Sequence, residues 1–150
     1  MSARFACVVA LATLGGVASA ETKANCELIE ISATSAKEPV IDSDVKVLEK
    51  KLKKPPFSSW NSFKVLSRAQ RSVTQNKPEA VKLAHGTATV LLSSMSAAKP
   101  PRISLTVTID DQDGKRVLDT KLNSDGGEWL VVGRSIPKSN DGELLALTCN

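Results

Sequence analysis

The sequence predicts a mainly β protein, either an antiparallel β-sandwich or an open barrel of about eight strands, with one short N-terminal amphipathic helix. Three observations predict this class. Residues 102–110 alternate apolar and polar side chains, as a half-buried strand does. Turn dipeptides such as Asp113-Gly114 separate further short runs of this kind. One apolar stripe with helical spacing, in residues 44–54, is followed by two prolines.

The N-terminus predicts a secretory signal peptide over residues 1–20. Arg4 precedes an apolar run of thirteen residues, and small residues precede Glu21. A membrane helix needs about 20 apolar residues, so cleavage after Ala20 is favoured and no transmembrane segment is expected after signal removal. Residues 21–150 then form a single β-rich domain. We expect a periplasmic or extracellular protein.

Two cysteines, Cys26 and Cys149, remain near the two ends of the mature chain. In an exported protein an even pair most simply forms a disulfide, and two free buried thiols are the alternative. Cys26 lies on the first predicted strand, residues 26–34, and Cys149 on the last. A disulfide would therefore join strands that lie close together.

The predicted helix follows the first strand. Asp42 or Ser43 is a candidate N-cap, and Glu49 and Lys53 are spaced to form an i, i+4 ion pair. The apolar residues at i, i+3 and i+7 form one stripe: Val45, Leu48 and Leu52.

Seven further strands follow, each bounded by turn residues. They are predicted over residues 62–73, 79–84, 87–95, 102–110, 115–123, 128–136 and 143–149. His85-Gly86 is predicted to form a two-residue hairpin turn, because histidine accepts a positive φ better than most residues. The loop at residues 97–101 is expected on the surface.

A lysine cluster covers the predicted helix: Lys46, Lys50, Lys51, Lys53 and Lys54. Residues 46–82 hold ten Lys or Arg and only two acids, Glu49 and Glu79. These lysines lie mostly off the apolar stripe, so one interpretation is a solvated helix face. The other is a contact for an anionic partner, such as lipid head groups or acidic glycans.

Three aromatic residues follow the prolines: Phe57, Trp60 and Phe63. The chain holds three Phe, two Trp and no Tyr, so the core needs such residues. One interpretation is that they anchor the helix end to the sheet. The other is an exposed aromatic contact beside the lysines.

The motifs of common enzymes and metal sites do not occur. His85 is the only histidine, and no serine lies in a nucleophile-elbow pattern. Residues 110–114, DDQDG, resemble part of a calcium loop, but Thr120 stands where a bidentate Glu is needed. Acids such as Asp141 and Glu143 are predicted in turns. We therefore expect no catalytic, cofactor-binding or metal site.

The run LKKPPFSSWNSFKVLSRAQ, followed by VKLAHGTATVLL, resembles a set of small exported bacterial proteins that share a K-x-P-P-F-x-x-aromatic-x-S-aromatic core. The resemblance covers about a third of the chain, because only these two segments carry it. It implies an envelope setting and one compact domain, and it implies no activity.

These observations favour a non-enzymatic exported domain that binds or scaffolds an envelope protein. The first alternative is a basic module that docks on anionic envelope surfaces through the lysine cluster. The second is an enzyme whose residues form no recognisable motif. A nucleic-acid partner is unlikely after export, and the oligomeric state is left open.

Overall fold

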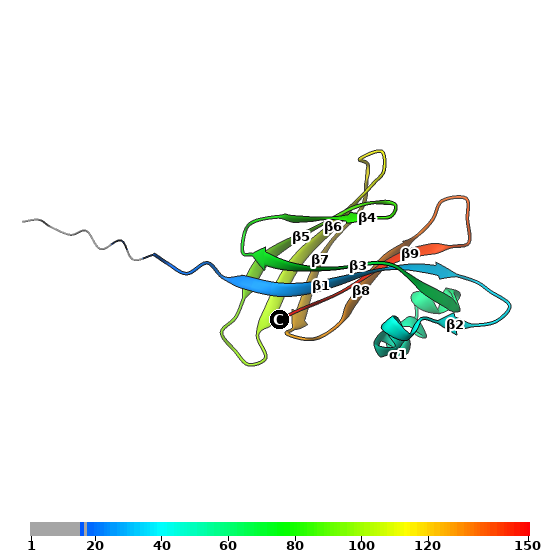
Figure 1. The fold of residues 1–150 in the computed structure, drawn as a ribbon, viewed down its shortest axis with the longest axis horizontal. Coiled ribbons are helices and arrows are strands. Elements are labelled where there is room, and N and C mark those ends of the chain that lie inside the picture. Colours follow the sequence, from blue (N-terminus) through cyan, green and yellow to red (C-terminus); the bar gives the residue numbers. More distant parts are fainter. Residues whose placement is uncertain (1–15, 17) are drawn as a thin grey trace, which may run out of the picture.

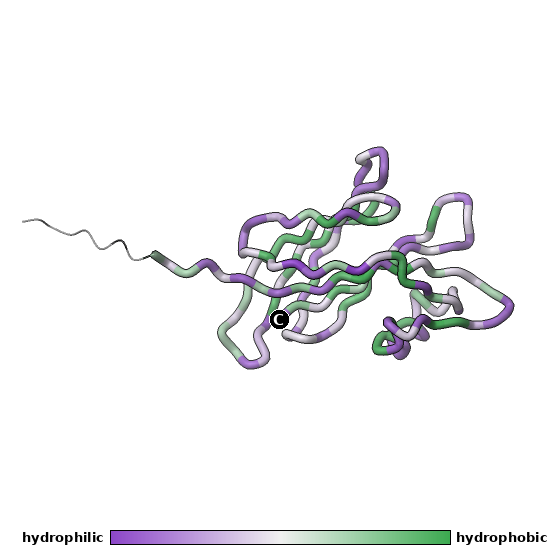
Figure 2. The backbone as a smooth tube through the Cα atoms, in the orientation of Figure 1, coloured by the Kyte–Doolittle hydropathy of each residue, from purple (hydrophilic) through white to green (hydrophobic). Residues whose placement is uncertain are grey.

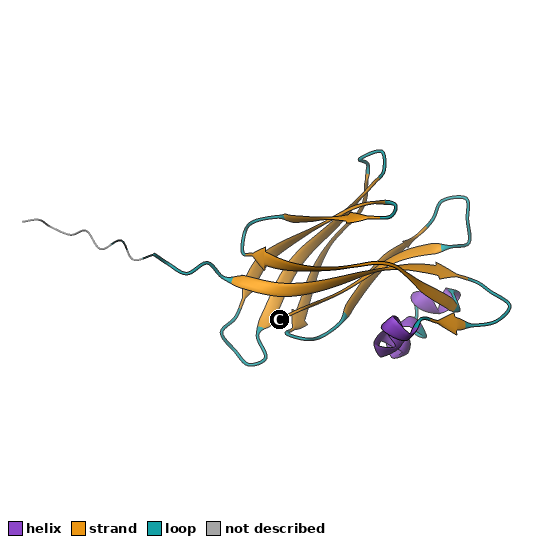
Figure 3. Cartoon of the chain, viewed as in Figure 1, coloured by secondary structure: helices purple, strands orange, loops and turns teal. Residues whose placement is uncertain are grey.

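The computed structural model describes residues 16 and 18–150, so the predicted signal peptide lies almost wholly outside the described residues. Within the described residues the protein is mainly β, as predicted, with nine strands in two sheets (Figures 1 and 3). The first sheet has the order β2 (Val40–Ile41), β3 (Ser62–Thr74), β1 (Lys23–Thr34), β9 (Gly142–Cys149) and β8 (Leu130–Ser135). The second has the order β4 (Glu79–Leu83), β5 (Gly86–Met95), β6 (Arg102–Asp111) and β7 (Arg116–Asp125).

The two sheets share one core. Alternate residues of β6 point into it, as predicted: Ile103, Leu105, Val107 and Ile109 are at most 2% exposed. Residues of β1, β3, β8 and β9 from the first sheet meet them. Apart from β2, which lies at the edge of the first sheet beside β3, the strands follow one another around this core in chain order, and β1 pairs with both β3 and β9. Neither β3 with β4 nor β7 with β8 shares a ladder in the described part of the chain, so the sheets stay separate.

A helical segment covers the outer face of the first sheet near the end of β1 (Figure 1). It comprises η1 (Ser43–Leu48), α1 (Glu49–Leu52) and η2 (Phe57–Ser59). The predicted stripe is confirmed, since Val45, Leu48 and Leu52 are fully buried. The prediction of an N-terminal helix is wrong, because the segment follows β1 and β2. Most of it is 3₁₀ rather than α-helix.

Strand β1 is therefore buried on both faces. Ala24, Cys26 and Leu28 face the core between the sheets, whereas Ile29 and Ile31 face the helical segment. A bulge in β3 makes this arrangement possible. The register shows it, since Glu30 pairs with Ser67 whereas Ile31 pairs with Val65. The extra residue, Leu66, is 43% exposed. It reverses the alternation, so Val65 lies under the helical segment and Ser67 faces inward.

A short strand precedes the helical segment, because β2 pairs there in parallel with β3. The predicted N-cap needs correction, since Asp42 occupies the N-cap position without capping the helix. Its carboxylate accepts a hydrogen bond from the Val65 N–H at 2.8 Å instead. This bond ties the helix start to the β3 bulge. The predicted Glu49–Lys53 ion pair is present.

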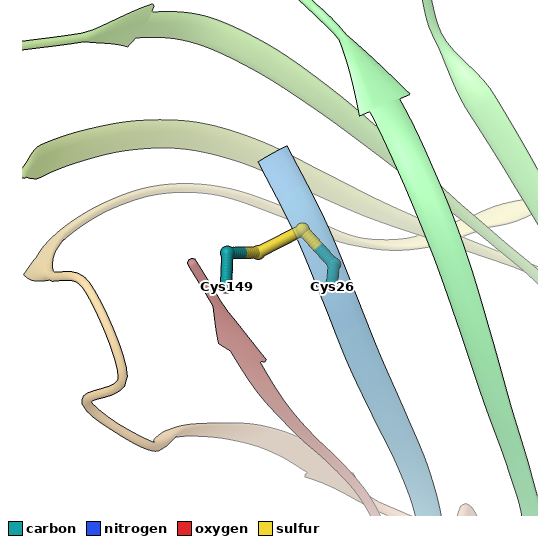
Figure 4. Close-up of a disulfide and its surroundings, with 2 residues drawn as sticks. All are labelled: Cys26 and Cys149. Atoms are coloured by element: carbon teal, nitrogen blue, oxygen red, sulfur yellow. A yellow bond between two sulfur atoms is a disulfide. The ribbon is translucent and has the colours of Figure 1, made fainter. Parts of the chain in front are cut away.

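Cys26 and Cys149 form a disulfide between directly opposed residues of β1 and β9 (Figure 4). The neighbouring residues, Asn25 and Asn150, exchange two backbone hydrogen bonds of 2.8 and 2.9 Å. The cysteines therefore occupy the non-hydrogen-bonded position, where facing side chains approach most closely. The first and last long strands are thus linked covalently, as predicted.

Candidate functional site

A polar cluster lies where the core between the sheets reaches the turns at one end. Glu30 of β1 is 1% exposed and Glu143 of β9 is 3% exposed. Glu30 stands opposite Leu145, two residues from Glu143, so the two carboxyl groups are diagonal neighbours on the inward face. Arg134 of β8 stands directly opposite Glu143. We call Glu30, Ser67, Arg134 and Glu143 the polar end.

Glu30 connects the two sheets. Its carboxylate accepts a hydrogen bond from the Ser67 hydroxyl at 2.7 Å. It also accepts the Ala84 N–H, at 2.9 and 3.0 Å from its two oxygens. Ala84 belongs to the turn between β4 and β5 in the other sheet. A buried carboxylate with several donors is stabilised without a full counter-ion. Glu30 is therefore a structural link that closes this end of the core.

Glu143 is less fully satisfied. Its Oε2 accepts hydrogen bonds from Arg134 Nη2 at 3.0 Å and Nε at 3.3 Å. Its Oε1 is buried and has no hydrogen-bond donor in the described structure. Burial raises the pKa of Glu143, Arg134 acts in the opposite direction, and the neighbouring Glu30 adds to the rise. Glu143 is thus a buried carboxyl group whose surroundings disfavour its charged form, in spite of Arg134.

A cavity of about 290 Å³ opens beside Glu143. Its other lining residues come from three connections between strands and from the ends of β6 and β8: His85, Asp111, Gln112, Asp113, Arg134 and Ile136. The connections after β6 and β8 are mostly hydrophilic loops in Figure 2, beyond the more apolar strands. Buried carboxyl groups with a shifted pKa beside a cavity are features of functional sites. This cavity is therefore the candidate site, and we call it the end cavity.

The connection that carries His85 is shaped by a close backbone approach. Leu83 pairs with Gly86, so the two turn residues are Ala84 and His85, one position earlier than predicted. Gly86 has φ +154, and a Cβ there would lie 2.1 Å from the Asp110 carbonyl oxygen. Only glycine fits this contact. Outside glycine, the positive φ values in the described residues are at Asn76 and Lys138, so the expected positive φ at His85 is wrong.

The charge of the end cavity is mainly negative. Glu143 and Arg134 offset each other, and Asp111 and Asp113 remain at the rim. Asp111 Oδ1 accepts the N–H groups of Asp113 and Lys115 at 3.0 and 2.9 Å, which holds that turn in place. No group of three or more potential metal ligands occurs among residues 16 and 18–150. The arrangement suits a donor of N–H groups with positive charge.

All five residues of the lysine cluster are exposed. Lys53 pairs with Glu49, and Lys51 lies 3.7 Å from Glu128. These are surface ion pairs, which contribute little to stability. None of the five lines the end cavity, and carboxylates offset the charge of Lys51 and Lys53.

The three aromatic residues were predicted either to anchor the helix end to the sheet or to form an exposed contact, and they differ in burial. Phe63 is 2% exposed and belongs to the core beneath the helical segment. Phe57 and Trp60 are partly buried against that core. They also line a separate cleft with Gly133, Arg134, Ser135 and Asn140. Trp60 donates its indole N–H to the Asn140 carbonyl oxygen at 2.7 Å.

Sequence reasoning missed Glu30, Arg134 and Glu143. Glu143 was predicted where a turn meets the last strand; it is the second residue of β9, and its burial was not predicted. A signal was present in β1, because Glu30 follows Leu28 and Ile29 and precedes Ile31, and apolar residues on both faces predict a strand buried on both faces. A charged residue inside such a run must be buried and partnered. Glu143 gave no such signal, because Asp141 and Gly142 precede it.

Comparison with protein-family models, with curated proteins and with solved structures gave no significant match. In the part of the chain that the structure describes, no helix has the length and apolar character needed to cross a bilayer.

Proposed function

We propose that this protein is a non-enzymatic exported binding domain of the cell envelope, and that its end cavity receives a cationic nitrogen group of the partner. The carrying observation is the acidic lining of the cavity, in which the carboxyl groups of Asp111, Asp113 and Glu143 outnumber the one guanidinium, Arg134, which is paired with Glu143. An ammonium or guanidinium group would be attracted by the remaining carboxylates. The Cys26–Cys149 disulfide supports export, because disulfides persist in oxidising compartments.

Binding is favoured over catalysis by the burial of the carboxyl pair. Glu30 accepts hydrogen bonds from Ser67 and Ala84 and does not line the end cavity. A dyad that shares a proton in catalysis needs both carboxyl groups to face the reacting atoms. Of this pair only Glu143 lines the cavity, where Asp111 and Asp113 accompany it. Recognition of a cationic group needs an acidic lining but no such dyad.

The test uses spermidine as the probe and the ring protons of His85 as the reporter. His85 is the only histidine and lines the end cavity, so its NMR signals are unique. We expect saturable shifts with spermidine, and at least tenfold weaker binding in Glu143→Gln or Asp113→Asn. Asp119→Asn, an exposed acid on β7, is the matched control. Absence of saturable shifts, or equal affinity in all four proteins, would contradict the proposal.

A second candidate function is docking on anionic envelope surfaces through the lysine cluster. The exposure of all five lysines favours it, while the carboxylates beside Lys51 and Lys53 weaken it. Each lysine near an anionic membrane contributes about 1 kcal/mol at most. The variant with Lys46, Lys50 and Lys54 changed to Gln should lose retention on anionic vesicles at low salt. Equal retention of this variant and the wild type would show a merely solvated face.

A further inference from the structure

A second cavity, separate from the end cavity, lies between the helical segment and the connection that follows β8. Its volume is about 310 Å³, at the lower end of the roughly 300–1,000 Å³ range of small-molecule sites. Phe57, Ser59 and Trp60 line one side, and Arg134, Ser135 and Asn140 line the other. We call it the aromatic cleft.

Trp60 is a fixed wall of this cleft. Its indole N–H is held by the Asn140 carbonyl oxygen at 2.7 Å. Its six-membered ring lies against Gly142, where an added Cβ would be only 2.4 Å from a ring carbon. Both contacts come from the β8–β9 connection and the start of β9. A wall that is already held in place loses little conformational entropy when a ligand binds.

The polar lining carries almost no free charge. Arg134 is its one charged residue, and the guanidinium is paired with Glu143 at 3.0 Å. The remaining polar side chains are hydroxyls and an amide, on Ser59, Ser135, Ser139 and Asn140. These groups both donate and accept hydrogen bonds. Such a lining matches a neutral ligand with many hydroxyl groups rather than an ion.

We propose that the aromatic cleft binds a neutral saccharide. The C–H groups on one face of a sugar ring carry partial positive charge and stack on the negative face of an aromatic ring. The sugar hydroxyls pair with serine hydroxyls and with the asparagine amide. Trp60 and Phe57 supply the ring surfaces, and Ser59, Ser135 and Asn140 supply the polar groups. The inference is independent of the cationic partner in the end cavity.

The experiment follows the fluorescence of Trp60. The chain has two tryptophans, so Trp129→Phe leaves Trp60 as the only indole, and Trp129 does not line the cleft. Cellotetraose and chitotetraose are the probes. At least one should cause a saturable change in Trp60 emission. Adding Ser135→Ala and Asn140→Ala should weaken that binding at least tenfold, because two hydrogen-bonding side chains are lost.

Ser93→Ala is the matched control, since Ser93 is an exposed strand residue outside the cleft. Melting temperatures of all variants show that they are folded. No saturable change with either saccharide at millimolar concentration overturns the proposal, and so does equal affinity in the variant without Ser135 and Asn140. Binding of a proline-rich peptide in place of both saccharides also overturns it. Failure of spermidine to bind the end cavity leaves this result unaffected.

Discussion

Among single residues, Glu143 is a carboxyl group at a buried position where an apolar side chain would be favoured. A carboxylate inside a β core is costly unless donors surround it. Arg134 supplies two, both to Oε2. The other oxygen has none, and the second carboxyl group, Glu30, lies beside it. Burial disfavours the charged form of Glu143 and Glu30 disfavours it further, so the pKa of Glu143 is raised although Arg134 acts in the opposite direction.

The pH dependence of stability follows from this raised pKa. The folded protein holds the Glu143 proton more tightly than the unfolded chain, whose carboxyl titrates near the ordinary value of 4.5. The stabilising contribution is full below that value and is lost as pH rises through the folded pKa. We expect wild type to lose stability relative to Glu143→Gln as pH rises above 4.5.

Urea unfolding at several pH values between about 4 and 8 measures this difference. Arg134 loses a partner in the variant, but this cost is constant because arginine stays charged throughout. Glu38→Gln, at an exposed position, is the control. It measures how the pH dependence of stability changes when an exposed carboxyl group is replaced. A difference between wild type and Glu143→Gln that stays constant, or that grows in favour of wild type as pH rises, would contradict the expected sign.

Among the elements, the helical segment illustrates both the strength and the limit of sequence reasoning. The spacing of Val45, Leu48 and Leu52 predicted the buried stripe. The same spacing could not show which face of which sheet the stripe would cover. That choice depends on β1, which is apolar on both faces, and on the bulge at Leu66. A bulge has no fixed sequence signature, because it adds one residue to an otherwise ordinary strand.

Contact between Trp60 and Gly142 joins the helical segment to β9. A Cβ at position 142 would lie 2.4 to 2.8 Å from three ring carbons of Trp60. Gly142→Ala should therefore destabilise the protein by about 1–3 kcal/mol, as overpacking does. In a Trp60→Ala background the same change should cost much less, because the ring is absent. A double-mutant cycle from chemical denaturation gives the coupling. If the two changes had additive effects on the free energy of unfolding, the contact between Trp60 and Gly142 would contribute nothing to stability.

For the whole molecule, alternation along each strand predicted the β class and the inward residues of β6. It could not assign strands to sheets, because an inward-facing residue looks the same in either sheet. Nor could it place the candidate site, which forms only where β8 and β9 meet the β4–β5 and β6–β7 turns. The one long-range contact that the sequence predicted was the disulfide, since compartment and cysteine count limited the choice.

The disulfide makes a prediction about the whole chain. It closes a loop of 123 residues, and the chain-entropy model gives about 4–5 kcal/mol for a loop of this length. Cys26→Ser with Cys149→Ser should therefore lower the free energy of unfolding by about that amount. The variant should still fold, because the backbone hydrogen bonds between Asn25 and Asn150 and the rest of the β1–β9 ladder do not depend on the sulfur atoms.

Two measurements check this account of the disulfide. Alkylation of the native protein without reductant, followed by intact-mass analysis, should leave Cys26 and Cys149 unmodified. Urea unfolding should give a larger m value for the double serine variant, because an unfolded chain without the cross-link exposes more surface. Labelling of both cysteines in the native protein would show that the bond is absent. An unchanged free energy of unfolding in the variant, with the bond present in wild type, would show that joining the first and last strands does not stabilise the fold.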